Sequence, residues 1–494
     1  MQNIYRIFRP ARVIYGSMLL LGVSASAQKN LLSVDWDRVT VVSKTTPTLQ
    51  VVENPMLHKN SPIHEATFAA LEALGADYVR YVPWFPYTKM AVAELKPPTT
   101  SETFWDFRYL DSTVSDFMTA TAGHSVVLNF STTPDWMWKT KELVKYPEDP
   151  YQVFWDYNQG TELRDTTVKQ VADYFGRVMS WYTRGGFTDE LGKFHKSDHH
   201  YKIPYWEVLN EPDGEHEISP KMYTRMYDAI VSELRKVSPA TKYIGIAAAF
   251  ESDPQRFEYF LNPKNHRPGV PLDGISYHHY STPSFPGQKL EEYQYVFFEK
   301  ASAFLDETRY IEAFRKRLSP RTITTINEIG TITNSTDGSD IEPGYWNASG
   351  AMYAYMFIEL TKIGIDVAGE SQLVGYPTQY PDVSMMDWKD AKPNARYWIL
   401  KLIHDHFGPG DRYVTTSFEG GDLYAQAMYT GRGKMILLIN PRDKEIKVNL
   451  PESVKGARVE WVDMDTNENP PADAQLTEAA ITLKPFAVAV VEIK

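Results

Sequence analysis

The stretch YWEVLNEP, from Tyr205 to Pro212, joins an apolar segment to a polar tripeptide and is the main indication of the fold class. Its apolar part predicts a buried β-strand, and Glu211 follows where that strand ends. The stretch TTINEIG, from Thr324 to Gly330, places Glu328 directly after a second apolar segment in the same way. In (β/α)₈ barrels the functional residues stand at the carboxyl ends of strands, where the loops build the pocket. The two stretches therefore predict a parallel barrel with Glu211 and Glu328 at one end.

Outward from these stretches, short β-branched segments alternate with longer segments of helical spacing, as is typical of βα units. The predicted strands are Leu49–Val52, Tyr78–Val82, Ser125–Phe130, Tyr205–Leu209, Tyr243–Ala248, Gly274–Tyr277, Thr322–Ile326 and Ile365–Ala368. The helices predicted between and after them include Pro62–Leu74, Thr167–Tyr182, Pro220–Val237, Tyr293–Leu318, Ala348–Lys362 and Tyr397–His406. This order predicts an α/β fold, a (β/α)₈ TIM barrel, over residues 47–408.

The pattern changes after the helix stop signal at Gly408–Gly410. Predicted strands joined by short turns then follow at Leu423–Thr430, Lys434–Asn440, Glu445–Leu450, Arg458–Asp463 and Phe486–Ile493. They predict a smaller antiparallel β-sandwich over residues 409–494. Leu32–Lys44 is also a predicted strand, and we expect residues 28–46 to join the sandwich.

Residues 1–27 have the order of parts of a secretory signal peptide. Arginines precede the apolar run Val13–Val23, which is too short to span a bilayer, and Ala25–Ala27 supplies small residues for cleavage. We expect the mature chain to begin at Gln28, to be secreted or periplasmic, and to have no membrane partner. A retained anchor is the alternative for this segment.

The composition of the chain excludes several classes of function. The chain has no cysteine, which excludes a disulfide framework and a thiol nucleophile. The net charge of −12 argues against nucleic acid as a partner. Neither a phosphate-cradling glycine loop nor a Gly-x-Ser-x-Gly elbow occurs, so the usual signals of nucleotide cofactors and α/β-hydrolases are missing. We expect no cofactor and no metal.

Two carboxyl groups about 5–5.5 Å apart are what retaining glycoside hydrolysis needs, one protonated to release the leaving group and one ionised to attack the sugar. Glu211 and Glu328 have the predicted placement for this chemistry, which makes a carbohydrate the expected substrate. The competing interpretation is that both are structural ion-pair partners.

From about Val51 to Asp411 the motifs resemble clan A glycoside hydrolases, and most closely family 39, which includes β-xylosidases and α-L-iduronidases. The resemblance implies that Glu211 is the general acid/base and Glu328 the nucleophile. It also implies that Arg80 supports the nucleophile and that Asn210 binds the 2-hydroxyl group of the sugar.

The run SYHHY, from Ser276 to Tyr280, resembles the Ser-x-His-x-Tyr pattern of the clan and implies that His278 and Tyr280 lie beside the carboxylates. Trp136, after the third predicted strand, is a candidate for stacking on a sugar ring. The chain departs from the clan after the eighth predicted strand, where Val367–Gln372 reads VAGESQ and lacks the usual Trp. The identity of the sugar is therefore open.

Other acidic and histidine residues receive a structural interpretation. Glu207 shares strand parity with Glu211 but is expected deeper in the barrel. The cluster Glu215–Glu217 and the pair His199–His200 lack the spacing of a metal motif and are expected in solvated loops.

These observations together predict a secreted retaining hydrolase of β-type glycosidic bonds that acts on oligosaccharides or polysaccharide chain ends. The alternatives are a catalytically silent carbohydrate-binding barrel and an endo-acting polysaccharide hydrolase.

Overall fold

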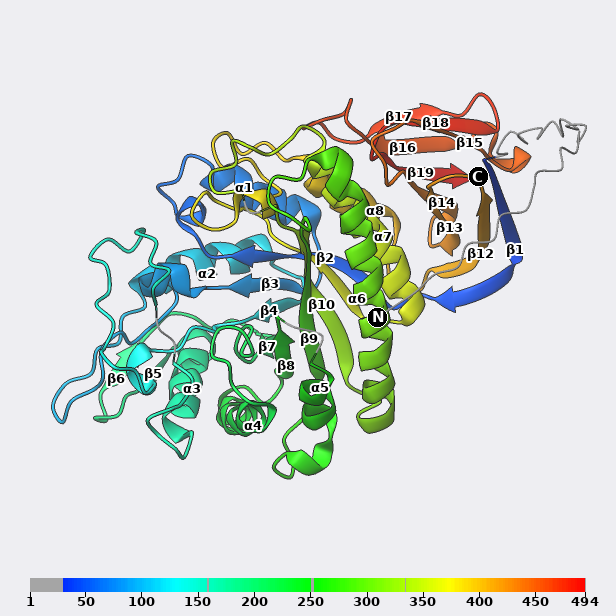
Figure 1. Cartoon of the computed structure of the whole chain (residues 1–494). Helices are drawn as coiled ribbons and strands as arrows, with labels where there is room; N and C mark the ends of the chain where they lie inside the picture. The colour runs from blue at the N-terminus through cyan, green and yellow to red at the C-terminus, as the bar shows by residue number, and fades with distance from the viewer. Residues whose placement is uncertain (1–29, 158–159, 250–252, 334, 494) are drawn as a thin grey trace, which may run out of the picture.

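The computed structural model describes residues 30–157, 160–249, 253–333 and 335–493. A barrel and a β-sheet domain lie side by side in it (Figure 1). The predicted signal peptide, residues 1–27, lies outside the described residues. Among the described residues we find no helix that could serve as a transmembrane span.

Eight parallel strands in the described residues close into a barrel, which confirms the predicted TIM barrel. Around the barrel they are β10 (Ile323–Thr331), β11 (Val367–Glu370), β2 (Thr46–Val52), β3 (Val79–Val82), β4 (Val126–Leu128), β7 (Tyr205–Glu207), β8 (Lys242–Ala248) and β9 (Gly274–Ser281). Every one of the eight predicted strands overlaps one of these. The ring of parallel strands is closed by β9, which pairs with both β8 and β10.

Helices surround the barrel (Figure 1). They are α1 (His64–Leu74), α2 (Arg108–Ala120), α3 (Lys169–Arg184), α4 (Pro220–Val237), α5 (Pro254–Leu261), α6 (Leu290–Leu318), α7 (Tyr345–Ile363) and α8 (Ala395–His406). The start of α4 shows why the sequence folds this way: Ser219 caps the amide of Met222, and Pro220 occupies the first turn, where its missing N–H costs nothing.

Short elements lie in the loops. The 3₁₀ turns are η1 (Pro55–Leu57), η2 (Phe85–Met90), η3 (Asp135–Met137), η4 (Pro263–Asn265), η5 (Pro381–Val383) and η6 (Glu452–Val454). A small hairpin, β5 (Gly186–Thr188) and β6 (Phe194–Lys196), follows α3 and was not among the predicted strands.

The second sheet has nine strands in the described residues. Its order is β17 (Ala472–Gln475), β16 (Arg458–Val462), β19 (Val488–Ile493), β14 (Gly433–Ile439), β13 (Tyr424–Thr430), β12 (Arg412–Glu419), β1 (Leu31–Val42), β15 (Ile446–Asn449) and β18 (Ala480–Leu483). The amino-terminal strand β1 pairs antiparallel with β12 and touches β15 in parallel. The sheet folds over, since Val448 of β15 shares one apolar core with Leu438 of β14 and Val491 of β19.

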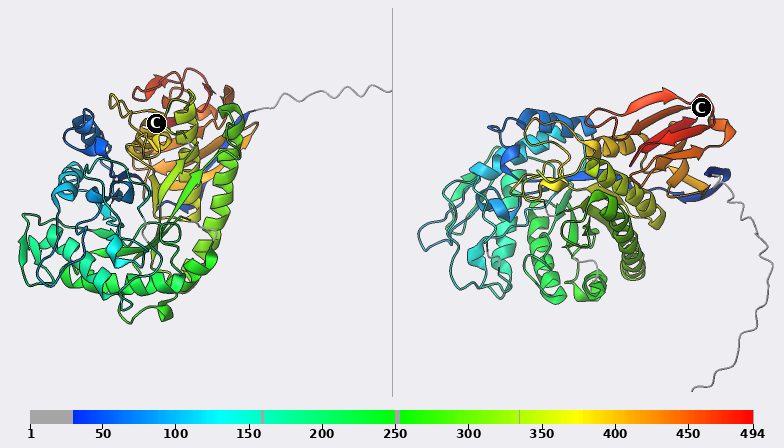
Figure 2. Two further views of the ribbon diagram at one scale, coloured as in Figure 1. Left: turned by 60° about the vertical axis from the view of Figure 1, so that its left-hand side comes forward. Right: turned by 45° about the horizontal axis from the view of Figure 1, so that its top comes forward.

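The sheet domain packs on the barrel through α7 and α8 (Figure 2). Leu437, Val488 and Val490 of the sheet belong to the same apolar core as the barrel and its helices. The ring centroids of Tyr355 on α7 and Tyr424 on β13 lie 4.2 Å apart. One continuous core therefore joins the two parts.

Candidate active site

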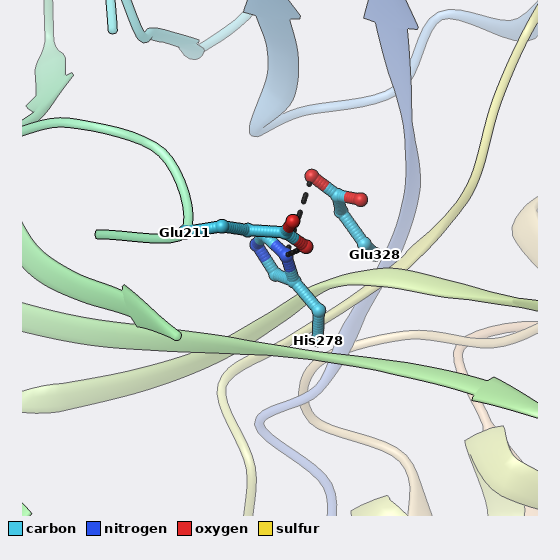
Figure 3. A group of neighbouring side chains, drawn as sticks. All are labelled: Glu211, His278 and Glu328. Carbon is cyan, nitrogen blue, oxygen red and sulfur yellow. Dashed lines mark hydrogen bonds and ion pairs between the residues drawn. The ribbon is translucent and has the colours of Figure 1, made fainter. Parts of the chain in front are cut away.

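Glu211, His278 and Glu328 converge at the carboxyl end of the barrel (Figure 3). Glu211 follows β7, His278 lies on β9, and Glu328 lies opposite it on β10. One side-chain ligand atom of each residue lies within 4.8 Å of the others. The structure thus brings together the two predicted carboxylates.

Arg80 is fully buried and binds four side chains. Its Nε donates to Glu207 at 2.5 Å, Nη1 donates to Glu328 at 2.5 Å and to Gln50 at 2.7 Å, and Nη2 donates to Asn210 at 2.6 Å. The rigid guanidinium fork is suited to holding several acceptors in fixed positions. Arg80 therefore fixes the direction of the Glu328 carboxylate and of the Asn210 amide.

Glu207 is the second carboxylate on Arg80 and lies in the barrel interior, as its depth along the strand predicted. It also accepts hydrogen bonds from Asn129 at 2.5 Å, Ser276 at 2.5 Å and Asn327 at 2.7 Å. Burial opposes its ionisation, but Arg80 and these donors outweigh burial and lower the pKa of Glu207. It is the buried counter-ion that allows Arg80 to sit in the barrel.

Glu328 is held in its ionised form. Tyr280 donates to Glu328 Oε2 at 2.6 Å, while Arg80 donates to Oε1. Burial raises the pKa of this carboxyl, but the charges of His278 and Arg80 and the hydrogen bond from Tyr280 outweigh burial, so the pKa is lowered. An ionised carboxylate is what a nucleophile requires.

Glu211 has a different environment. Its side chain is 23% exposed, and its Oε1 lies 2.7 Å from Nδ1 of His278. The same nitrogen lies 3.5 Å from Glu328. Burial disfavours the charged imidazole, but Glu328 and Glu211 outweigh burial and raise the pKa of His278. His278 thus connects the two carboxylates, one open to solvent and one enclosed.

The backbone that carries Glu211 is strained. Glu211 has φ 40° and Leu209 has φ 64°, both in the left-handed region. Such residues cost about 1–3 kcal/mol each and persist where the surrounding structure holds them. Here the amide of Glu211 donates to the carbonyl of Ala247 at 2.9 Å, which holds the turn against β8.

A pocket of about 160 Å³ opens beside the carboxylates. It is lined by Gln50, Val52, Val82, Trp84, Asn210, Glu211, Tyr280, Glu328, Ile332, Gln372, Tyr380 and Val383. Carboxylate, amide and hydroxyl groups share this lining with apolar side chains, as is usual in small-molecule sites.

Aromatic side chains stand at the mouth of this pocket. Trp84 stacks on Tyr380 with ring centroids 6.3 Å apart and meets Trp155 edge-on at 5.4 Å. The Trp84 indole donates to Glu215 at 2.7 Å, and Glu215 also accepts from Asn210 at 2.8 Å. The expectation that Glu215 belongs to a solvated loop is wrong, because its carboxylate ties the loop to the site.

Trp136 is not brought to this pocket. It is buried on η3, and its indole donates to the carbonyl of Glu94 at 2.9 Å. The aromatic residues that line or edge the pocket are Trp84 after β3, Trp155 after β4, Tyr280 on β9 and Tyr380 after β11. Spacing alone did not separate these rings from the packed ones.

At the end of β11, where clan members usually have a Trp, the carboxylate of Glu370 is directed away from the pocket. Glu370 is buried and pairs with Arg396 of α8 at 2.9 Å, and burial raises the pKa of Glu370 to about 7. Gln372 lines the pocket instead. The Ser371 hydroxyl lies 2.6 Å from both the Tyr280 hydroxyl and Gln50 Nε2. Small polar groups thus take the place of an aromatic floor.

Glu211, His278 and Glu328 also have the composition of a metal site. Arg80 already places a guanidinium 2.5 Å from Glu328, on the atom nearest His278. A cation bound there would meet that positive charge at close range. The donor set therefore suits proton transfer better than metal binding.

One family model matches the chain. It describes the C-terminal immunoglobulin-like domain of D-apionate lactonase and matches residues 421–491, within the second sheet. No protein with a curated description matches the sequence.

Solved structures match over nearly the whole length. The family 51 α-L-arabinofuranosidase of Thermotoga petrophila is 15% identical with a TM-score of 0.59, and the match covers 94% of this chain and 99% of that one. The catalytic domain of a family 30 xylanase from Talaromyces cellulolyticus is 10% identical with a TM-score of 0.60, covering 94% and 100%. A conserved exported protein from Bacteroides fragilis is 11% identical with a TM-score of 0.62, covering 93% and 99%.

These similarities establish the class of architecture, a TIM barrel followed by a β domain. It is the architecture of clan A glycoside hydrolases of families 51 and 30. The expected membership of family 39 is not confirmed.

Proposed function

We propose that the protein is a retaining glycoside hydrolase that removes single sugars from chain ends outside the cytoplasm. The observation that carries the proposal is the approach of Glu211 and Glu328 to within 4.8 Å at the carboxyl end of the barrel. Retaining enzymes place their carboxyl groups about 5–5.5 Å apart, whereas inverting enzymes leave about 6.5–9.5 Å for a water molecule. The short separation supports retention.

In the first step, Glu211 gives its proton to the glycosidic oxygen while Glu328 attacks the anomeric carbon. The bond to the leaving group breaks, and a glycosyl–Glu328 ester forms. Arg80 and Tyr280 hold Glu328 ionised and aimed before the attack.

In the second step, the Glu211 carboxylate takes a proton from water, the resulting hydroxide attacks the same carbon, and Glu328 leaves. His278 lies within reach of both carboxylates. It can therefore keep Glu211 in position while that carboxyl alternates between acid and base.

Trp84 and Tyr380 line the pocket beside the carboxylates and are placed to receive the sugar unit next to the one that is removed. The export expected from residues 1–27 places the substrate outside the cytoplasm.

The family match at residues 421–491 favours a second candidate, hydrolysis of a sugar lactone. A lactone presents an acyl carbon where a glycoside presents its anomeric carbon, and a carboxylate can activate water toward either. The two candidates are separated by assaying aryl glycosides and sugar γ-lactones with the same preparation.

The first experiment is a panel of aryl β-D-xylosides, β-D-glucosides and α-L-arabinofuranosides. Hydrolysis of at least one of them is expected, with retained configuration in the first product seen by proton NMR. Hydrolysis of lactones alone would establish the second candidate. Turnover of neither class would leave a silent carbohydrate-binding barrel, and cleavage restricted to internal bonds of a polymer would show an endo-acting enzyme.

Azide separates the roles of the two glutamates. With a substrate whose leaving group needs no proton, Glu211→Ala should still form the glycosyl–enzyme, and azide should restore turnover and give a glycosyl azide of unchanged configuration. Glu328→Gly should give only the inverted azide, by direct attack from the opposite face. Glu72→Ala, an exposed glutamate on α1, is the control and should behave as the unaltered enzyme. The inverted azide from Glu211→Ala would overturn the assignment.

A further inference from the structure

A second cleft, of about 320 Å³, lies between the barrel and the sheet domain. The loop between β10 and α7 and the loop between β11 and α8 form most of its wall, and these loops also contribute Ile332, Gln372 and Tyr380 to the active-site pocket. The loop after β16 closes the cleft with Met464, Asn467 and Glu468. The cleft is therefore adjacent along the chain to the site, but distinct from it.

Two indole rings line this cleft, Trp346 at the start of α7 and Trp388 in the loop before α8. Both are half-buried, and neither indole N–H has a hydrogen-bond acceptor among the described residues. Gly338 packs against Trp388, since a Cβ there would lie 2.6 Å from the ring. The close glycine fixes the orientation of the indole.

Asn347 lies beside these rings and is only 5% exposed, yet its Nδ2 has no hydrogen-bond partner in the described structure. Leaving a buried donor unsatisfied costs about 1–3 kcal/mol, so such a group needs an explanation. The atom is closed off from the cleft, so a hydroxyl oxygen of a bound molecule would satisfy it only after the amide turns outward.

The charges around the cleft do not select an anion. Lys389 and Lys392 face Glu342, Asp387 and Glu468, and Lys392 is already paired with Asp390 at 2.8 Å and with Glu468 at 3.5 Å. The remaining polar groups are neutral donors and acceptors suited to hydroxyl groups.

We propose that this cleft is a second carbohydrate-binding site, which takes a neutral sugar ring of a larger glycan. The ring would pack on an indole face, and the Asn347 amide would turn outward to donate to one of its hydroxyl groups. The proposal rests on the proposed function only in taking a glycan as the substrate. Two sites built by the same two loops can hold one branched or polymeric glycan at two points, which raises the effective concentration of its end at the catalytic pocket.

The test is affinity electrophoresis of the full chain carrying Glu328→Gln, through gels that contain soluble arabinoxylan, arabinan, galactan or mixed-linkage β-glucan. Retardation by at least one polysaccharide is expected. Adding Trp388→Ala and Asn347→Leu should weaken the apparent affinity about tenfold. Trp461→Ala, which alters a half-buried tryptophan in a groove of the sheet domain, is the matched control and should leave the retardation unchanged.

The effects of the variants on folding and on binding are measured separately, by Tm and by retardation. Asn347→Leu removes an unsatisfied donor but adds volume at a buried position, so its Tm is measured beside that of the unaltered chain. Trp388→Phe should keep both the fold and part of the retardation. Retardation by none of the four polysaccharides, or retardation that the double variant leaves intact, would overturn the proposal. Failure to hydrolyse any aryl glycoside would overturn the proposed function instead, and the gel result would still stand.

Discussion

At the scale of residues, Arg80 determines both the stability and the chemistry of the site. Arg80→Met removes a fully buried cation and leaves Glu207 and Glu328 without their shared partner. Breaking a buried ion pair by removing one partner typically costs about 3–5 kcal/mol. We expect a fall of this size in the free energy of unfolding, measured by urea denaturation, together with loss of turnover. Arg108→Met, which breaks an exposed pair with Asp106, should leave the free energy of unfolding nearly unchanged.

Tyr280 gives a prediction about pH. Its hydroxyl stabilises ionised Glu328, so Tyr280→Phe should raise the pKa of Glu328. A nucleophile whose pKa is lowered is active above that pKa and loses activity as the pH falls through it. The acidic limb of the kcat/KM profile should therefore move to higher pH, by about one unit for each 1.4 kcal/mol of lost stabilisation.

The control for this prediction is Tyr397→Phe. Its hydroxyl binds the carbonyl of Ala70, on the outside of the barrel. Its pH profile should match that of the unaltered enzyme. An acidic limb that does not move in Tyr280→Phe would show that the hydroxyl does not act on the ionisation of Glu328.

Glu211 and Glu328 were predicted from their positions at strand ends, and both lie at one end of the barrel. Arg80, Asn210 and His278, which the family resemblance implied, lie there with them. In a barrel, a polar side chain at the carboxyl end of a buried strand lies next to the loops that form the pocket. Loop residues carry no such constraint. The sequence therefore did not reveal that Glu215 turns inward to bind Asn210 and Trp84, or that Trp136 packs away from the pocket.

At the scale of elements, β1 gives a matched pair of substitutions. Leu32 is 1% exposed and belongs to the core of the sheet domain, whereas Val39 on the same strand is 43% exposed. Leu32→Ala should lower the free energy of unfolding by about 2–5 kcal/mol because it leaves a cavity. Val39→Ala should stay within about 0.5 kcal/mol. Equal effects in thermal and urea melts would contradict the pairing of β1 with this sheet.

The elements that could be predicted are those whose burial produces a recognisable pattern of apolar residues in the sequence. The eight barrel strands are almost entirely buried, because helices cover one side and the interior the other. In the sheet domain β12, β17 and β18 escaped prediction. β17 has no buried residue, and β12 alternates polar and apolar residues only loosely, so their pairing depends on partners distant in sequence.

At the scale of the whole molecule, the shared core predicts one cooperative unfolding transition. Leu437 and Val490 of the sheet are in the same core as α7 and α8, so neither part can unfold without exposing the other. Calorimetry should show a single peak with equal calorimetric and van't Hoff enthalpies. A chain ending at Gly408 should be insoluble, since it leaves that apolar face uncovered. Two separated peaks would contradict the prediction.

The position of β1 in the sheet also affects how the chain folds during synthesis. Leu31 pairs with Glu419, so the ribosome adds about 390 more residues after β1 before it has made the partner strand. At about 5–20 residues per second, that partner leaves the ribosome roughly 20–80 seconds after β1 does. During this interval β1 is an open edge, able to join any strand it meets, including its counterpart on a neighbouring nascent chain. Yield of native protein should therefore depend on chaperones that cover the first forty residues, and crowded polysomes should favour swapped pairs of chains.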